Sequence, residues 1–475
     1  MKIPAIKYLF INQIVADFRF WVALFFFLRL YGITLPPIET GHAWRQTFTC
    51  MVARNFLEQD PNIFLPRTDL SGLPGVMPGV VACEFPIFNY LIFLVAKIFG
   101  YQHWYGRLIN LIVSSFGIYA FYLMARRYFG DRTALFSGMV FLSSSWFMFS
   151  RKIMPDTFSV SLVLIGLYYL MKYIETGKWN ALLMFFFLGS LGGLSKIPAT
   201  IILSLSLIAV FSRTVDISKR MLTLVGFLAA GMIIFTWYFM WEPILLTRYN
   251  NQLYFPRAFA QGINDLWIQW DLTLDKFTFA SLRSYVALFF FILGTYQIIK
   301  TKESLLMLIL GITFPVLIYF MIKSGYVFAT HDYYILPFVP VMALIAGYGL
   351  ASVKWHKLAW VFLVFILIEG IANQAHDFRL KRSELYLLDI ETLADKVSSS
   401  SDYIAITGGL NPEEMYYAHR KGWGLGYEHL TDTAYLTKIR NQGCRFLFLN
   451  KKKAIPALDY PVVRDDIHYI IYRFD

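Results

Sequence analysis

The sequence predicts a polytopic α-helical membrane protein with a small C-terminal α/β domain. Apolar residues make up 57% of the 475 residues and charged residues only 16%, whereas soluble domains carry about 25% charge. Apolar runs recur from Trp21 almost to Ile371, as membrane-spanning helices require. Beyond residue 375 the pattern changes to that of a soluble domain.

The helices that we expect to span the membrane number about eleven, several of them near the short end of what crosses a core of ~30 Å. Phe20–Leu35 is expected to be a retained first helix, because it lacks small residues at a cleavage site and two prolines follow it. The expected spans are Phe20–Leu35, Tyr105–Met124, Ala134–Phe149, Phe158–Tyr173, Ala181–Leu194, Ile197–Phe211, Met221–Met240, Tyr285–Ile299, Leu305–Ile322, Tyr334–Leu350 and Leu358–Ile371.

The charge distribution predicts the orientation of these spans. The net charge is +12, but Lys and Arg sit mainly in short loops between apolar runs, so we expect no nucleic-acid partner. Placing the N-terminus, with Lys2 and Lys7, in the cytoplasm puts most of these loops inside, as the positive-inside rule requires. The prediction is therefore a multi-pass inner (plasma) membrane protein whose C-terminal domain is extracytoplasmic.

Two segments decide whether this orientation holds along the whole chain. Phe85–Phe99 is apolar but only ~22 Å long at helical rise, so we interpret it as an interfacial helix that begins at Pro86. The Gly192–Pro198 stretch is interpreted as a turn between two spans. A single span there would invert everything that follows.

The domain prediction follows from these segments. Residues 1–374 form the transmembrane domain, with a first outer loop at 36–104 and a second at 241–282, and residues 375–475 form the extracytoplasmic domain. In that domain we expect strands at Tyr403–Thr407, Arg445–Leu449 and Ile467–Arg473, and helices at Ser383–Val397, Pro412–His419 and Thr433–Asn441. The glycine-rich Gly422–Gly426 stretch is predicted to be a loop.

The three cysteines do not indicate a metal site or a catalytic thiol. Cys50, Cys83 and Cys444 match no metal-binding spacing. Cys50 and Cys83 share the first outer loop, where a disulfide is chemically allowed, but thiols are the favoured interpretation.

Ionisable side chains gather on the predicted outer face. They are Glu39, His42 and Arg45; Arg67 and Asp69; Glu84; Arg151, Lys152 and Asp156; Lys196; His331 and Asp332. Any one of them alone is more readily explained as a headgroup contact. Together they suit glycosyl transfer from a lipid phosphate, since the acceptor hydroxyl needs a base and the leaving phosphate needs cations or a metal.

Short motifs in this order resemble the GT-C glycosyltransferases, in their bacterial protein-mannosyltransferase-like branch (family 39, aminoarabinose-transferase-like). The matching pieces are His42-x-Trp-Arg-Gln46, Ala53-Arg-Asn-Phe56, Asn62-Ile63 with Pro66-Arg67-x-Asp69, Glu84-Phe-Pro86, Met154-Pro-Asp156 and His331-Asp-Tyr-Tyr334. The layout of the whole chain agrees, including the C-terminal outer domain.

The resemblance implies an inverting transferase that takes its sugar from a polyprenyl phosphate at the outer face of the inner membrane. Members of the family carry an acidic base in the first loop, often within an Asp-Glu pair. This chain has only Glu39 there, followed by His42, so either residue is a candidate base. Lipid A relatives carry Lys where this chain has Phe85, which disfavours lipid A as the acceptor and shifts the cationic role to Arg45 or Lys196.

We therefore predict that Glu39 and His42 serve catalysis. The predicted substrate-binding residues are Arg45, Asp69, Glu84, Asp156, Lys196, His331 and Asp332. If a divalent metal takes part, its candidate ligands are Glu84, Asp156 and His331. The expected partners are a polyprenyl-phosphate sugar, membrane lipids and an acceptor of unknown class. The alternatives are a transporter or lipid flippase, which would place charges near the membrane midplane, and a non-catalytic envelope-assembly scaffold.

Overall fold

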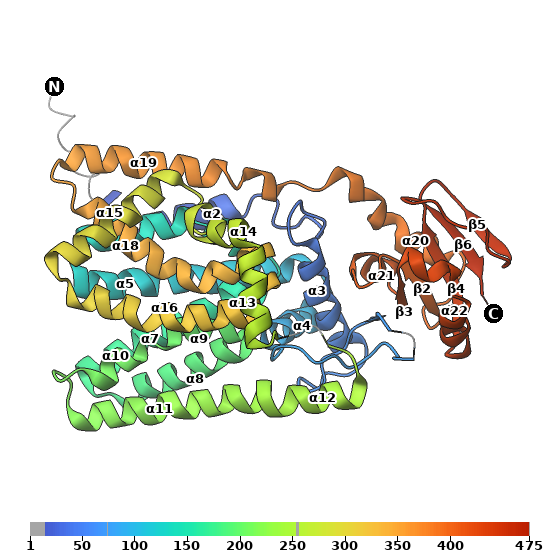
Figure 1. Ribbon diagram of the computed structural model, residues 1–475, viewed down its shortest axis with the longest axis horizontal. Coiled ribbons are helices and arrows are strands. Elements are labelled where there is room, and N and C mark those ends of the chain that lie inside the picture. The colour runs from blue at the N-terminus through green and yellow to red at the C-terminus, as the bar shows by residue number, and fades with distance from the viewer. Residues whose placement is uncertain (1–14, 74, 253–255, 475) are drawn as a thin grey trace. The chain divides into compact units, whose positions relative to one another are not determined.

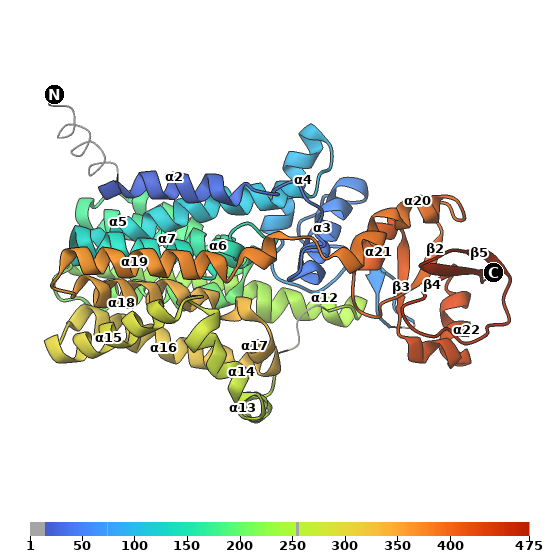
Figure 2. The same ribbon diagram turned by 90° about the horizontal axis from the view of Figure 1, so that it is seen from above.

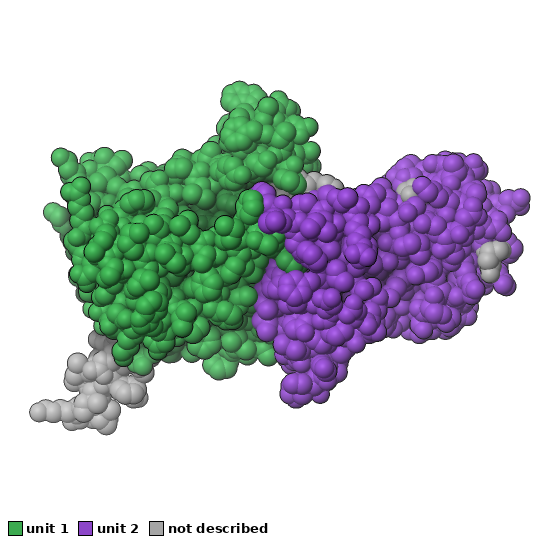
Figure 3. Space-filling view, turned by 90° about the horizontal axis from the view of Figure 1, so that it is seen from below, with its two compact units in different colours: residues 1–33, 107–238, 255–378 green, residues 34–106, 239–254, 379–475 purple. Residues whose placement is uncertain are grey.

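The computed structural model describes residues 15–73, 75–252 and 256–474, so Lys2 and Lys7 lie outside the described residues. The chain packs into two compact units, coloured separately in Figure 3. Unit 1 combines the residues up to 33 with 107–238 and 255–378. Unit 2 combines 34–106 and 239–254 with the chain from Arg379 to the C-terminus. The predicted boundary between residues 374 and 375 stays a prediction.

Unit 1 is a bundle of helices (Figures 1 and 2). Its helices are α2 (Phe18–Arg29), α5 (Trp104–Ser143), α6 (Trp146–Phe149), α7 (Pro155–Thr176), α8 (Trp179–Ser195), α9 (Thr200–Leu203), α10 (Ser206–Phe211), α11 (Ile217–Phe235), α13 (Phe259–Ile268), α14 (Trp270–Asp275), α15 (Tyr285–Thr301), α16 (Ser304–Ser324), α17 (Tyr326–Thr330), α18 (Val339–Ala351) and α19 (His356–Ala372).

Several of these helices are long and apolar enough to cross a membrane. Among the described residues there are five, or six if a pair bent by 91° counts as one span. The five are Trp104–Ser143, Pro155–Thr176, Ile217–Tyr249, Ser304–Ser324 and Asp332–Ala351, and the bent pair is Trp270–Ala280 with Tyr285–Thr301. The membrane character is thus confirmed, while the count of eleven spans stays a prediction.

Two predicted breaks are present in the bundle. Gly130 has a φ of 80° and a ψ of 170°, which kinks α5 between its two predicted spans. Lys196 has extended backbone between α8 and the short 3₁₀ helix Ile197–Ala199. The turn predicted at Gly192–Pro198 is therefore confirmed as a break between two separate helices.

Unit 2 joins the first loop to the C-terminal domain. Its helices are α3 (Ala43–Glu58), α4 (Ile87–Phe99), α12 (Glu242–Tyr249), α20 (Ile390–Asp395), α21 (Glu413–Ala418) and α22 (Thr433–Asn441), with a 3₁₀ helix η6 at Arg382–Asp389. Pro86 immediately precedes α4, which confirms where that helix begins. All three cysteines are thiols rather than halves of a disulfide.

A six-stranded sheet forms the core of the C-terminal domain. Its strands are β1 (Leu70–Ser71), β2 (Tyr403–Thr407), β3 (Lys421–Leu425), β4 (Cys444–Asn450), β5 (Val462–Asp465) and β6 (Tyr469–Arg473). Their order is β1-β3-β2-β4-β6-β5. β1, β3, β2 and β4 are parallel, whereas β6 and β5 are antiparallel to their neighbours. β1 belongs to the first loop, so this loop supplies an edge strand of the C-terminal sheet.

The predicted Gly422–Gly426 loop is wrong, because these residues lie mostly in β3. Glycine is disfavoured in strands, but two close approaches of the backbone require it here. A Cβ on Gly422, whose φ is +152°, would lie 1.7 Å from the Ile404 carbonyl oxygen. A Cβ on Gly424 would lie 1.7 Å from the Gly409 carbonyl oxygen.

The other predicted elements of the domain are present with small changes. The strands predicted at Tyr403–Thr407, Arg445–Leu449 and Ile467–Arg473 correspond to β2, β4 and β6. The helix predicted at Ser383–Val397 begins as the 3₁₀ helix η6 and continues as α20.

Packing between α15 and α18 depends on a missing side chain. A Cβ on Gly294 of α15 would lie 2.1 Å from the Ile345 carbonyl oxygen of α18, whereas a Cβ on Gly311 of α16 would meet nothing within 4 Å. Small residues let membrane helices approach closely. We expect Gly294→Ala to destabilise the protein by about 1–3 kcal/mol and to lower its melting temperature in detergent. Gly311→Ala is the matched control, and equal melting temperatures would contradict this packing.

Glu414 makes the stability of the C-terminal domain depend on pH. Burial raises the pKa of its carboxyl to about 7 from an ordinary 4.5. The folded state therefore holds this proton more tightly, so its stabilising contribution is full below about pH 4.5 and declines until pH 7. We expect Glu414→Gln to flatten this part of the curve of melting temperature against pH. Glu428→Gln, at an exposed side chain, should leave the curve unchanged, and a flattened curve in both variants would contradict the assignment.

Candidate active site

The candidate base lies just before α3. The Glu39 residue is 1% exposed, and Gln46 Nε2 donates a hydrogen bond to its Oε2 at 3.2 Å. Residues Glu39 and Leu380 form an isolated antiparallel bridge. The reserve base, His42, precedes α3 in the left-handed region with a φ of 64° and is half-buried. Gln46 is thus a polar partner of the site whose contact the sequence did not predict.

Arg45 and Glu84 form an ion pair, although 39 residues separate them in the sequence. Their side chains are 5% and 14% exposed, and the Arg45 guanidinium carbon lies 5.6 Å from the centre of the Phe48 ring. A carboxylate in this position restricts the rotamers of the guanidinium while leaving it charged. The pair therefore holds a cation in the same helical turn that follows Glu39.

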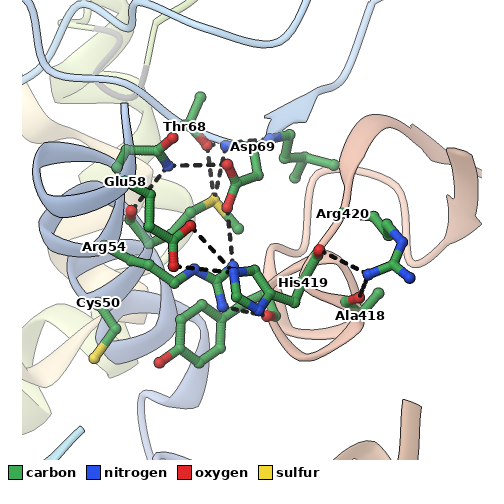
Figure 4. A network of polar contacts seen from close by, with 12 residues as sticks. Cys50, Arg54, Glu58, Thr68, Asp69, Ala418, His419 and Arg420 are labelled. Carbon is green, nitrogen blue, oxygen red and sulfur yellow. Dashed lines mark hydrogen bonds and ion pairs between the residues drawn. The ribbon is translucent and has the colours of Figure 1, made fainter. Parts of the chain in front are cut away.

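Asp69 lies in a different network, in which both of its carboxylate oxygens accept hydrogen bonds, as Figure 4 shows. Arg54 Nη2 donates to its Oδ2 at 3.0 Å and Asn55 Nδ2 donates to its Oδ1 at 2.9 Å. Arg54 also donates to the Tyr416 carbonyl oxygen at 3.1 Å, and its guanidinium lies 4.6 Å from the centre of that ring. The network links α3, the segment before β1, and α21, so this geometry suits a structural part for Asp69.

His419 adds a second contact between α3 and the C-terminal domain. Its Nε2 lies 3.1 Å from the Glu58 carboxylate, and its Nδ1 lies 2.7 Å from Glu391 Oε1. The hydrogen bond with Glu58 raises the pKa of the imidazole above its ordinary value. Arg54 and Glu58 thus attach the C-terminal end of α3 to the domain, as Figure 4 shows.

Unit 1 brings together the other predicted residues. Asp156, in the first turn of α7, lies with its Oδ1 3.6 Å from Lys196 Nζ. The same ammonium lies 5.5 Å and 5.9 Å from the ring centres of Tyr333 and Tyr334. These four side chains come from α7, the break after α8, and the turn before α18. They form a carboxylate–cation–aromatic cluster.

His331 and Asp332 extend this cluster. The His331 ring centre lies 5.3 Å from that of Tyr333, and burial lowers the pKa of the imidazole below its ordinary value, which favours the neutral form. Asp332 is held by Lys276 Nζ at 2.5 Å and by Arg283 Nη2 at 2.6 Å. The sequence analysis did not include Lys276 and Arg283 among the site residues. Their position could have indicated them, because the positive-inside rule disfavours two cations near the end of an expected outer segment.

Lys152 and Arg151, also expected on the outer face, are buried in unit 1. Lys152 Nζ lies 3.4 Å from Asp377 Oδ1, and the Arg151 guanidinium lies 4.3 Å from the centre of the Phe378 ring. Burying a charge costs several kcal/mol unless it is paired. Their contacts therefore tie the loop before α7 to the segment after α19.

The described residues contain no cluster that supports the predicted metal site. In the part of the chain that the structure describes, no three His, Cys, Asp or Glu residues lie together as metal ligands. Glu84 belongs to unit 2, whereas Asp156 and His331 belong to unit 1. A divalent metal stays a prediction.

The two roles open to Asp69, structural and substrate-binding, give different outcomes for Asp69→Asn. If the carboxylate balances the buried Arg54 charge, the change should destabilise the protein by about 3–5 kcal/mol. The matched control is Asp60→Asn at the partly exposed Asp60–Arg67 pair, where we expect about 1 kcal/mol or less. Melting temperatures of both variants provide the measurement. An unchanged melting temperature together with weakened substrate use would instead assign Asp69 to the substrate.

One family model matches part of the chain. Residues 83–241 match the family model for dolichyl-phosphate-mannose-protein mannosyltransferases. A comparison with curated proteins finds no match.

Solved structures with the same fold cover nearly the whole chain. ArnT from Cupriavidus metallidurans in the apo state superposes with a TM-score of 0.59 at 12% identity, over 96% of this chain and 98% of that one. ArnT bound to undecaprenyl phosphate gives 0.59 at 13% identity, with the same coverage. The apo oligosaccharyltransferase of Archaeoglobus fulgidus gives 0.58 at 11% identity, over 90% of this chain and 69% of that one. The chain therefore has a GT-C fold like that of ArnT, and its residues 83–241 resemble the mannosyltransferase family.

Proposed function

We propose that this protein is an inverting glycosyltransferase that moves a sugar from a polyprenyl phosphate to a glycan, lipid or protein acceptor. The observation that carries the proposal is the fold shared with ArnT over 96% of the chain. That relative was solved bound to undecaprenyl phosphate, and the archaeal enzyme AglB was solved with a dolichol-phosphate and an inhibitory peptide. Lipid phosphates are thus bound by two proteins that have this fold.

The chemistry needs one base and at least one cation. The acceptor oxygen attacks the anomeric carbon from the face opposite the phosphate, and the bond between that carbon and the phosphate oxygen breaks. Glu39 takes the proton of the acceptor hydroxyl. The leaving polyprenyl phosphate keeps the electron pair, and cationic groups stabilise its charge.

Arg45 is the proposed phosphate-binding cation. A guanidinium stays charged and donates two parallel hydrogen bonds to phosphate oxygens. The Glu84 carboxylate orients it, and the Phe48 ring supports it. Lys196 of unit 1 is the other candidate cation, oriented by Asp156 and lying near two tyrosine rings. His331 and Asp332 complete that cluster as ligands for the sugar or phosphate.

The reaction is proposed to take place at the outer face of the inner membrane. The Lys and Arg bias of the loops supports this placement, with the Arg213–Arg220 loop in the cytoplasm and the C-terminal domain outside. Cysteine-accessibility labelling that finds the C-terminal domain inside would contradict it.

The activity assay follows from the chemistry. Purified protein is incubated with a panel of polyprenyl-phosphate sugars, and release of the sugar or of the free lipid phosphate is measured by mass spectrometry. We expect consumption of one donor class. Consumption of none, by a folded protein with membrane extract supplied as a source of acceptor, would contradict the proposal.

Glu39→Gln tests the assignment of the base. The amide keeps the hydrogen-bonding shape of the carboxylate but does not accept a proton at neutral pH, so we expect turnover to fall by about 10²-fold or more. His42→Ala is measured beside it. Near-normal turnover in Glu39→Gln with no turnover in His42→Ala would give the role of base to the imidazole.

Arg45→Ala and Arg45→Lys test the phosphate contact. We expect Arg45→Ala to raise the KM for the donor sharply and Arg45→Lys to recover only part of the loss, because an ammonium does not reproduce the bidentate fork. Removing Arg45 leaves the Glu84 carboxylate without this partner, so the double variant Arg45→Ala with Glu84→Gln controls for folding. Unchanged donor kinetics in a folded Arg45→Ala would remove Arg45 from the site.

A further inference from the structure

Unit 1 contains an apolar cavity of about 440 Å³ between its helices. The helices that line it are α5, α7, α9, α10, α16 and α18. The lining residues of α7 recur at helical spacing and so share one face of that helix. They include Leu164, Leu167, Leu170, Met171 and Ile174. This face of α7 therefore forms a continuous apolar wall of the cavity.

The cavity lies away from the carboxylate–cation–aromatic cluster of unit 1. Asp156 of that cluster is in the first turn of α7, whereas the lining of the cavity extends from Leu164 to Glu175, at the other end of the same helix. At helical rise, Asp156 and Glu175 are ~28 Å apart along α7. The cavity is thus distinct from the site that we propose for the sugar donor.

Polar side chains line one end of the cavity. They are Arg127 and Tyr128 of α5, Glu175 of α7, and Ser212 and Thr214 between α10 and α11. Arg127 Nε donates to Glu175 Oε1 at 2.7 Å, and Ser212 Oγ lies 2.9 Å from Thr214 Oγ1. An apolar chamber with a charged and hydroxylated end suits a ligand that has a hydrocarbon chain and a polar head.

The polar end carries an excess of positive charge. Four segments contribute lining residues there: 126–132, 172–178, 212–220 and 300–305. Together they contain ten Lys and Arg residues and four Asp and Glu residues. Glu175 is shared between Arg127 and Lys172, whose Nζ lies 3.1 Å from Oε2, and Lys219 Nζ donates to the Ile174 carbonyl oxygen at 2.6 Å. Basic pockets between membrane helices bind anionic lipid headgroups.

Figure 1 shows the connections α10–α11 and α15–α16 at the same end of the bundle. The cavity reaches inward from this end over the α7 stretch Leu164–Glu175, which is ~16 Å long at helical rise. That length is close to half of a hydrocarbon core of ~30 Å, which is the depth of one leaflet. The cavity therefore matches an acyl chain that enters from one side of the membrane.

An apolar cavity of this size is unfavourable when empty, because its lining loses dispersion contacts and the loss grows with volume. An engineered apolar cavity of roughly 150 Å³ already binds benzene, and the cavity of unit 1 is larger. In a bilayer the ligand at hand is the hydrocarbon chain of a lipid. A bound chain restores the missing contacts among the helices around the cavity.

We propose that the cavity binds one acyl chain of an anionic phospholipid whose headgroup phosphate contacts Arg127. A guanidinium has five N–H groups and its bond to Glu175 uses one, so the same side chain holds the carboxylate and a phosphate together. A polyprenyl phosphate also joins a hydrocarbon chain to a phosphate, but its chain is longer than one leaflet is deep. The acyl chain of a phospholipid fits the length of the cavity.

The test uses the purified full-length protein in detergent. The probe is phosphatidylglycerol with a photoreactive diazirine on one acyl chain, and the labelled residues are mapped by peptide mass spectrometry after illumination. We expect adducts on the lining residues of α7 and α10. Adducts on exposed helix faces with none on the lining would overturn the proposal, because the lipid would then only surround the protein.

A filled cavity should exclude the probe. Ala209→Phe places a ring among the lining residues, and its control, Ala372→Phe, adds the same ring at an exposed position of α19. We expect Ala209→Phe to abolish labelling of the α7 lining and Ala372→Phe to retain it. A folded Ala209→Phe that is labelled like the wild type would overturn the proposal.

Arg127→Ala tests the headgroup contact without a change in the helix packing, since this side chain is 61% exposed. The control is Arg126→Ala, because Arg126 is 55% exposed, pairs with Asp131 and lies outside the lining. We expect Arg127→Ala to bind the probe about tenfold more weakly and Arg126→Ala to stay within about twofold of the wild type. Equal affinities in the two variants would overturn the proposed phosphate contact.

Unlabelled lipids compete with the probe and identify the ligand. We expect phosphatidylglycerol to displace the probe at a lower concentration than phosphatidylcholine with the same chains, because phosphatidylcholine has no net charge to match the cations. Equal displacement by the two lipids would overturn the preference for an anionic headgroup. Displacement by undecaprenyl phosphate at a lower concentration than phosphatidylglycerol would overturn the proposal in favour of the chain of a polyprenyl donor.

Discussion

The buried ion pair between Arg54 and Asp69 is the interaction on which unit 2 depends. Their side chains are 7% and 6% exposed, and removing two charges from water costs several kcal/mol each unless the remaining hydrogen bonds are made. Asn55 bonds the second carboxylate oxygen and the Tyr416 carbonyl accepts from the guanidinium. The pair therefore specifies one arrangement of three segments that are distant in sequence.

This pair also explains how a loop gives a rigid candidate site. Near its C-terminal end, α3 is held by Arg54 and Glu58 against the C-terminal domain. At its N-terminal end, the Trp44 indole N–H donates to the Leu410 carbonyl oxygen at 3.1 Å, and Glu39 pairs with Leu380. Arg45 and Gln46 thus lie on a helix that is fixed at both ends, and Glu39 lies just before it, as precise catalytic geometry requires. The C-terminal domain is part of the site's support rather than an appendage.

Much of this fold is predictable from the sequence. The long apolar helices and the strands at Tyr403–Thr407 and Arg445–Leu449 follow from hydrophobic periodicity, which is a local signal. The strand Lys421–Leu425 does not follow, because its glycines are required by backbone approaches to Ile404 and Gly409 that exist only in the folded chain. β1 is also not predictable from local sequence, because a strand of two residues at the edge of a sheet is recognised only by its pairing with β3.

The candidate site, like the fold, is predictable from the sequence only in part. Residue types and their order point to Glu39, Arg45 and Lys196, but pairing is a property of three-dimensional structure. Glu84 comes to Arg45 from 39 positions along the chain, and Asp332 comes to Lys276 from 56 positions away. The sequence likewise does not distinguish Asp69, which is bonded at both oxygens by Arg54 and Asn55, from the carboxylates that we propose to face a substrate.

A cryo-electron microscopy structure of the protein with undecaprenyl phosphate tests the proposed phosphate-binding cations most directly. We expect phosphate density within hydrogen-bonding distance of Arg45 or Lys196, with the isoprenoid chain on an apolar helix surface. Phosphate bound away from both cations, or a protein that binds no undecaprenyl phosphate at saturating concentration, would contradict it.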